Sequence, residues 1–349
     1  MKTIERLLIR TPNWLGDIVM ALPGIAIARD MYPRAEVTIA TPAPFAALFR
    51  ERTIVGPVDL VSLTGKRSAE AKAIRGRFDA VLLMPNSFGS AWTAWRASVP
   101  ERWGYASSDR WLLLTKAVPK PRHRVHQSDY YTNLVSRLRP DADDATGLTR
   151  DTTYDRLPWI EVTERTRERA DALLASRGIA GDRRIVGFAP GAAYGHAKQW
   201  PSASVADVIA KVANSRGTTS VLVGAAGDRD AGREIESALG ARVGAPALFM
   251  NLIGDTDLPQ LMGVLSRCEA VISNDSGAMH VAAALGRPIV AVFGPTDERV
   301  TAPVGGHAVL HTDVACRPCM LRDCPIDHRC MTRITPDQVE RALAERLRA

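Results

Sequence analysis

The chain has 349 residues, 46% of them hydrophobic and 24% charged, which is the composition of a globular protein long enough for two domains. Lysine and arginine exceed aspartate and glutamate by 45 to 38, and the resulting net charge of +7 favours nucleotides or an anionic membrane surface as partners. Nucleic acid is disfavoured, because no zinc-finger, recognition-helix or RNA-binding aromatic pattern occurs. Without a signal peptide or an apolar run of ~20 residues, we expect a cytoplasmic protein.

The first half of the chain alternates strand and helix patterns. Residues 7–10 predict a strand, residues 11–17 a loop, and residues from 18 onward a helix with Pro23 in its first turns. Further strands are expected at residues 37–40, 58–63 and 78–84. This alternation predicts a parallel sheet covered on both faces. The tryptophans that follow are expected to lie mainly in the core: Trp92, Trp95, Trp103 and Trp111.

A second α/β series follows a polar, turn-rich stretch at residues 141–156, which we interpret as a linker. Its strands are expected at residues 184–188, 220–223, 270–273, 289–293 and 308–311, and its helices at residues 163–177, 204–215 and 258–266. The last residues predict an amphipathic helix. We therefore expect a domain at 1–160, a second at 161–335 and a terminal helix at 336–349.

The loop after the first strand carries a candidate catalytic carboxylate. Asp17 lies where a helix begins, so it is either a partner of the helix dipole or a general base toward a hydroxyl group. Asn13 and Trp14 precede it and could hold a polar, ringed substrate. The sequence alone leaves both readings of Asp17 open.

Two loops of the second half carry groups suited to a nucleotide diphosphate. Lys198 lies in a glycine-bearing loop after residues 184–188 and could act as a point charge against phosphate, although a surface lysine is the simpler reading. The loop is not a Walker A motif, and the chain has no G-x-G-x-x-G pattern. Asp228 follows the next strand and is a candidate ligand for a ribose, whereas Asp230 is expected on a helix surface.

The stretch from 270 to 297 reads as strand, loop, helix, strand and loop. Asp275, Ser276 and Gly277 lie at the start of its helix, and His280 lies one turn further on. A helix that begins directly after a strand presents unpaired backbone N–H groups, and its dipole favours phosphate there. A capped helix between two core strands is the simpler reading, but it assigns no role to the Asp and the His. Together with Lys198 and Asp228, which follow two other strands of the same half, these residues indicate a site for a nucleotide diphosphate.

Four of the five cysteines lie close together in the sequence: Cys316, Cys319, Cys324 and Cys330. In a cytosolic protein such a group is either reduced thiols or a metal site. A structural Zn site is the less favoured reading, because the second pair lacks the close spacing of zinc ribbons, although His311 and His328 could replace a ligand. We expect this cluster to be a scaffold or a lid and not catalytic, with no metal in the catalytic site.

The chain resembles the ADP-heptose:lipopolysaccharide heptosyltransferases of glycosyltransferase family 9 in three stretches. These are Gly16-Asp17, the stretch from Pro190-Gly191 to Pro201, and Asn274-Asp275-Ser276-Gly277 with His280. The resemblance covers nearly the whole chain, and the cysteine-rich tail is most similar to the heptosyltransferase II branch. It implies an α/β GT-B fold, in which two Rossmann-like domains face each other across a cleft. It also implies an inverting transfer of heptose from ADP-heptose to a Kdo–lipid A acceptor bearing heptose, at the inner face of the inner membrane.

The resemblance implies a role for each candidate. Asp17 would be the general base, Lys198 would neutralise the donor phosphates, and Ser276 with Gly277 would bind the diphosphate through N–H groups. Asp228 would hold the ribose, in place of the longer Glu of the family, and Asp275 and His280 would contact the phosphate or heptose. No divalent metal is required. A sugar-nucleotide epimerase of the same fold and a non-enzymatic sugar- or nucleotide-binding protein are the alternatives.

Overall fold

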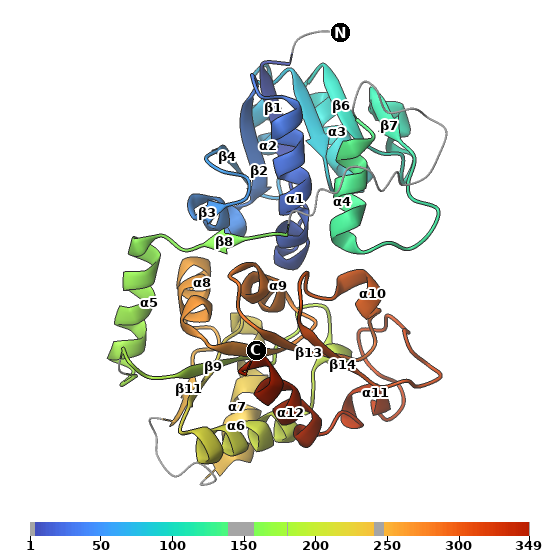
Figure 1. Ribbon diagram of the computed structural model, residues 1–349. Helices are drawn as coiled ribbons and strands as arrows, with labels where there is room; N and C mark the ends of the chain where they lie inside the picture. The colour runs from blue at the N-terminus through green and yellow to red at the C-terminus, as the bar shows by residue number, and fades with distance from the viewer. Residues whose placement is uncertain (1–3, 139–156, 180, 241–247, 349) are drawn as a thin grey trace. The chain divides into compact units, whose positions relative to one another are not determined.

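The structure is a computed structural model that describes residues 4–138, 157–179, 181–240 and 248–348. It divides into two compact units, Met1–Trp159 and Ile160–Ala349 (Figure 1). The linker predicted at residues 141–156 lies outside the described residues. None of the helices in the described ranges is long and apolar enough to cross a membrane.

The first unit is built on one six-stranded parallel sheet. Its strands are β1 (Arg6–Arg10), β2 (Glu36–Pro42), β4 (Asp59–Leu63), β5 (Ala80–Leu83), β6 (Glu101–Tyr105) and β7 (Lys116–Val118), with a short β3 (Arg52–Thr53) outside the sheet. Its helices are α1 (Leu15–Met31), α2 (Arg67–Ile74), α3 (Phe88–Arg96) and α4 (Gln127–Ser136), with 3₁₀ turns η1 (Ala43–Arg50) and η2 (Arg110–Leu113).

The strand order β4-β2-β1-β5-β6-β7 is that of a Rossmann fold, because the chain winds outward in both directions from β1. Leu7, Leu8 and Ile9 of β1 are at most 1% exposed, as expected for a central strand covered on both faces. Helices α1 and α4 pack together, and so do α2 and α3. The strand order reverses between β1 and β5, so the carboxyl ends of these two strands mark the place for a ligand.

The second unit repeats the same plan. Its strands are β8 (Ile160–Glu161), β9 (Ile185–Ala189), β10 (Thr219–Leu222), β11 (Phe249–Asn251), β12 (Ala270–Asn274), β13 (Ile289–Phe293) and β14 (Ala308–His311). Its helices are α5 (Glu164–Ser176), α6 (Ser202–Arg216), α7 (Arg229–Leu239), α8 (Leu258–Arg267), α9 (Gly277–Ala284), α10 (Glu298–Thr301), α11 (Arg329–Thr332) and α12 (Pro336–Arg346), with 3₁₀ turns η3 (His196–Lys198) and η4 (Ala226–Asp228).

The sheet of the second unit has the order β11-β10-β9-β12-β13-β14, again parallel throughout and again of Rossmann type. Helices α6, α7 and α12 form one packed group, and α5, α8 and α9 form another. The terminal helix α12 contacts β12, β13 and β14, so it is part of this unit (Figure 1). The order reverses between β9 and β12, whose carboxyl ends carry the loops with Lys198 and Asp275.

The first helix differs from its prediction. It begins at Leu15, so Asp17 lies in its first turn and not in the loop, and Pro23 lies in its interior. The N-cap is Trp14, which makes no side-chain capping bond, and a sequence signal for this boundary is therefore missing. The prediction for the tryptophans was also partly wrong: Trp103 is buried, but Trp95 and Trp111 are 46% and 55% exposed.

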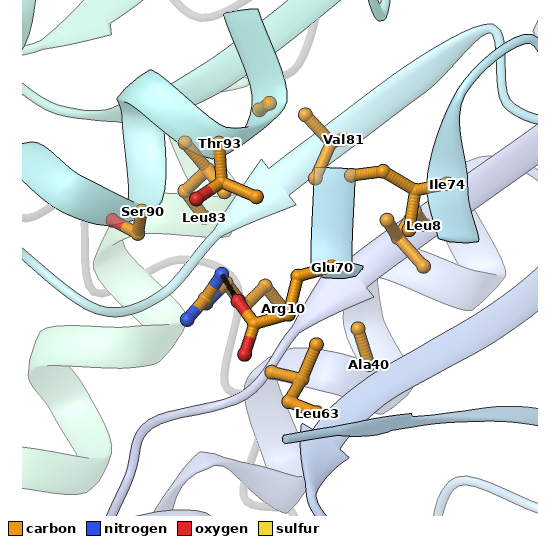
Figure 2. A pocket seen from close by; sticks show the side chains of 11 residues that line it. Leu8, Arg10, Ala40, Leu63, Glu70, Ile74, Val81, Leu83, Ser90 and Thr93 are labelled. Carbon is orange, nitrogen blue, oxygen red and sulfur yellow. Dashed lines mark hydrogen bonds and ion pairs between the residues drawn. The ribbon is translucent and has the colours of Figure 1, made fainter. Parts of the chain in front are cut away.

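A largely buried ion pair connects β1 to α2. Arg10 Nη1 donates to Glu70 Oε2 at 3.1 Å, among the apolar side chains of Leu8, Ala40 and Leu63 (Figure 2). Glu70 also accepts a hydrogen bond from the backbone N–H of Gly65. Loss of either partner would leave the other charge unpaired in apolar surroundings, which is costly. The contact therefore holds α2 against the sheet.

Candidate functional site

The loop after β9 is attached to the end of β12 through Asn274. The Asn274 side-chain amide donates to the carbonyl of Pro190, and its Oδ1 accepts from the backbone N–H of Trp200 at 3.3 Å. Asn274 is 3% exposed, so these bonds form in a dry environment. One side chain thus holds both ends of the loop that carries Lys198.

Lys198 and Asp275 form the central pair of the site. Lys198 Nζ lies 2.7 Å from Asp275 Oδ2, and the two side chains are 13% and 6% exposed. Thr301 Oγ1, at the end of α10, lies 3.4 Å from the same carboxylate oxygen. The surface reading of Lys198 is therefore wrong, because its ammonium is held in a largely buried pair at the switch point of the sheet.

Helix α9 begins beside this pair. Ser276 is its N-cap, and the Ser276 hydroxyl accepts from the backbone N–H of Met279 at 3.4 Å and also bonds the hydroxyl of Ser273 at 3.1 Å. Gly277 is the first helical residue, and His280, one turn further, is 4% exposed. The serine side chain serves the cap, so an anion here would be bound by backbone N–H groups and by the helix dipole.

Asp228 packs across the other end of the Lys198 loop. Its Oδ2 accepts the backbone N–H of Ala225 at 3.0 Å, and a Cβ added to Gly191 would lie 2.2 Å from its Cγ. Only glycine allows this approach. Asp230, in contrast, is an exposed residue of α7 that pairs with Arg233, as predicted.

The candidate base lies in the first unit, at the start of α1. The hydroxyl of Tyr131 on α4 donates to Asp17 Oδ1 at 3.2 Å. Burial raises the pKa of Tyr131 well above its ordinary value, and the Asp17 carboxylate adds to this, so the phenol keeps its proton and remains a donor. A carboxylate fixed in this way can accept a proton from a hydroxyl as a bond forms.

The two residues predicted to flank the base are on the surface. Trp14 is 56% exposed, and Asn13 is also exposed, so both are available to a ligand. Nearby, the carboxyl end of β5 is held by Arg110, whose guanidinium is fully buried and donates to the carbonyls of Tyr105 and Pro85. Burial lowers the pKa of Arg110 to about 10, which leaves it charged at neutral pH.

The cysteine cluster contains free thiols. Cys316, Cys319 and Cys324 are exposed and Cys330 is buried, and burial together with the three other cysteines raises the pKa of Cys330. In the described parts of the chain, no three His, Cys, Asp or Glu side chains are grouped to hold a metal ion. The zinc site stays a hypothesis.

Three residues of the site were not identified from the sequence. Tyr131 and Thr301 reach Asp17 and Asp275 from distant elements, and no local pattern marks them. Asn274 was named only as part of the stretch 274–277, and its bonds to both ends of the Lys198 loop were not expected. Each depends on a tertiary contact.

Comparison with known proteins identifies the family. Residues 67–329 match glycosyltransferase family 9 (heptosyltransferase). The chain is 32% identical to lipopolysaccharide heptosyltransferase 2 of Salmonella typhimurium, and the match covers 87% of this chain and 86% of that protein. It is also 32% identical to the Escherichia coli protein of the same name, with the same coverage of 87% and 86% of the two chains. It is also similar to the solved structure of E. coli ADP-heptose LPS heptosyltransferase II, with a TM-score of 0.80, 28% identity and 98% coverage of both chains. The chain therefore belongs to glycosyltransferase family 9 and has the GT-B type of fold, with two Rossmann-like units.

Proposed function

We propose that this glycosyltransferase moves L-glycero-D-manno-heptose from ADP-heptose to the heptose/Kdo inner core of lipopolysaccharide, and that it adds the second heptose. The proposal that the enzyme binds ADP-heptose rests on the largely buried Lys198–Asp275 pair beside the N-terminus of α9. The proposal that lipopolysaccharide is the acceptor rests on the names of the relatives.

The second unit binds the donor in this proposal. Lys198 and the backbone N–H groups at Ser276 and Gly277 bind the diphosphate, because a helix N-terminus and a neighbouring ammonium both attract negative charge. Asp228 accepts hydrogen bonds from the adenosine ribose. His280 and Asp275 contact the phosphate or the heptose side of the donor.

The first unit supplies the acceptor side and the base, with Asn13 and Trp14 as contacts of the acceptor sugar. Asp17 takes the proton of the acceptor hydroxyl while that oxygen forms a bond to the anomeric carbon of the heptose. The bond from this carbon to the phosphate oxygen breaks on the opposite face, and its electron pair leaves with ADP. A single displacement of this kind inverts the configuration. Since Lys198 and the α9 amides stabilise the departing diphosphate, the mechanism requires no metal ion.

We further propose that the enzyme works in the cytoplasm, at the anionic inner face of the inner membrane, where a Kdo–lipid A acceptor lies. The net charge of +7 supports this. So do the exposed apolar side chains of two elements of the first unit that contact each other: Phe88 and Trp95 of α3, and Trp111 and Leu112 of η2. Sedimentation with phosphatidylglycerol vesicles, but not with phosphatidylcholine vesicles, is the expected result; equal recovery with both would contradict it.

The activity is tested by ADP release from ADP-heptose with two truncated acceptors, one ending in Kdo and one bearing a first heptose. Release is expected only with the heptose-bearing acceptor. Release with the Kdo acceptor would assign the first transfer instead, and turnover of the sugar nucleotide without any acceptor would favour an epimerase. A protein that binds the donor and converts nothing would be a binding protein.

A further inference from the structure

The segment between β14 and α11, residues 312–328, is attached to the loop that carries Lys198. The hydroxyl of Tyr194 donates to the carbonyl of Met320 at 2.8 Å, and the backbone N–H of Ala197 donates to the carbonyl of Arg322 at the same distance. The ring Nε2 of His328 lies 2.7 Å from the carbonyl of Ala197. The position of the Lys198 loop therefore depends on this segment.

The approach of the two segments is closest at Arg322. A Cβ added to Gly195 would lie 2.4 Å from the carbonyl oxygen of Arg322 and 2.7 Å from its Cα. No larger residue fits without a shift of backbone, so the glycine permits the contact. Arg322 is thus placed by its backbone, and its side chain takes no part in the hydrogen bonds that hold the loop.

The Arg322 side chain lies on the same aromatic ring as the ammonium of Lys198. The guanidinium Cζ is 5.3 Å from the ring centroid of Tyr194, and Lys198 Nζ is 5.0 Å from that centroid. Both distances are within the range of a cation–π contact. The two cations are therefore separated by no more than about 10 Å, which is roughly the Debye length in 0.1 M salt.

Without Arg322, the side chains around the Tyr194 ring add no net positive charge to the attraction that the α9 amides exert on a diphosphate. Lys198 is already paired with Asp275, so the pair has no net charge. The neighbouring carboxylate Asp323 lies 3.0 Å from His196 Nδ1, a contact that is an ion pair only when the imidazole is protonated. Within the ranges that the structure describes, Arg322 forms no ion pair. Its guanidinium makes a cation–π contact with Tyr194. It is exposed, so an anion can reach it.

We propose that Arg322 is a second diphosphate-binding cation, which the segment 312–328 brings to the donor site from outside the Rossmann core. The inference rests on the proposed function, because it takes the Lys198 site to bind the diphosphate of a sugar nucleotide. Lys198 is largely neutralised by its partner, and Arg322 supplies the net positive charge that the diphosphate requires.

The test compares the binding of ADP and of adenosine by calorimetry. Arg322→Gln is expected to weaken ADP binding about 10-fold, the effect of losing one charged hydrogen bond, and to leave adenosine binding unchanged. Arg322→Lys keeps the charge and is expected to retain most of the affinity. The matched control is Arg333→Gln, which removes another exposed charge just beyond α11 and is expected to leave the binding of both ligands unchanged. Both glutamine variants are expected to melt like the parent protein.

Three outcomes would overturn the proposal. If Arg322→Gln weakens ADP and adenosine equally, the side chain supports the loop and does not bind the diphosphate. If Lys198→Met weakens ADP binding but Arg322→Gln does not, Arg322 is not a ligand and the donor site still stands. If neither variant changes ADP binding, the donor site itself is wrong, and the proposed function fails with it.

Discussion

The Lys198–Asp275 pair gives the most detailed prediction. Lys198→Met leaves a carboxylate that is 6% exposed, with the Thr301 hydroxyl 3.4 Å away as its remaining side-chain contact. Breaking a buried pair costs about 3–5 kcal/mol, and we expect the lower end, about 3 kcal/mol, because Lys198 is still 13% exposed. For a unit of this size, that loss lowers Tm by about 6–12 °C. ADP affinity is expected to fall as well, because a charged hydrogen bond to phosphate is lost.

The double variant Lys198→Met/Asp275→Asn separates the two effects. It leaves no unpaired buried charge, so its Tm is expected within about 4 °C of the parent protein, while ADP binding recovers only in part. Lys211→Met is the control, because the pair between Lys211 and Asp337 is largely exposed and contributes at most about 1 kcal/mol. Differential scanning fluorimetry and calorimetry with ADP measure both quantities. Equal Tm values for the single and the double variant would refute the reasoning.

Three further predictions concern separate parts of the site. Gly191→Ala must displace the Asp228 carboxylate and is expected to weaken ADP binding about 10-fold, as measured by calorimetry. Gly227→Ala, at a position with open space around it, is expected to bind ADP normally. Equal affinities of the two variants would show that Asp228 does not contribute to donor binding. Tyr131→Phe removes the hydrogen bond to Asp17 and is expected to lower kcat about 10-fold with ADP affinity unchanged. An unchanged kcat would show that Tyr131 does not position Asp17. EDTA is expected to leave the transfer rate unchanged, and a large fall would require a metal in the mechanism.

The elements with strong local signals could be predicted from the sequence. Strands Ile289–Phe293 and Ala308–His311 lie at the predicted residues, because short apolar runs between turn residues mark strands. The first is buried, and the second is a half-buried edge strand. Helix α9 begins at Gly277, where the sequence places its start, because the Ser276 cap is a local pattern. The sequence also grouped Lys198 with Asp275, and the structure brings their side chains to 2.7 Å from each other.

The remaining features depend on contacts that the sequence does not display. The start of α1 has no capping side chain, so its first turn and the position of Asp17 in it were missed. The short strand β7, Lys116–Val118, has too few apolar residues to form a pattern. Tyr131 and Arg322 reach the site from elements far away in the chain, and only the folded structure brings them to Asp17 and Tyr194.

The central claim, that Asp17 is the base and the second unit holds the donor, is tested most directly by Asp17→Asn. The amide keeps the size of the side chain but cannot take the acceptor proton, and general base catalysis contributes about 10²–10⁴-fold. We therefore measure kcat for heptose transfer together with the Kd for ADP. The account predicts a kcat lowered by at least about 100-fold with an unchanged Kd, and a kcat close to that of the parent protein would contradict it.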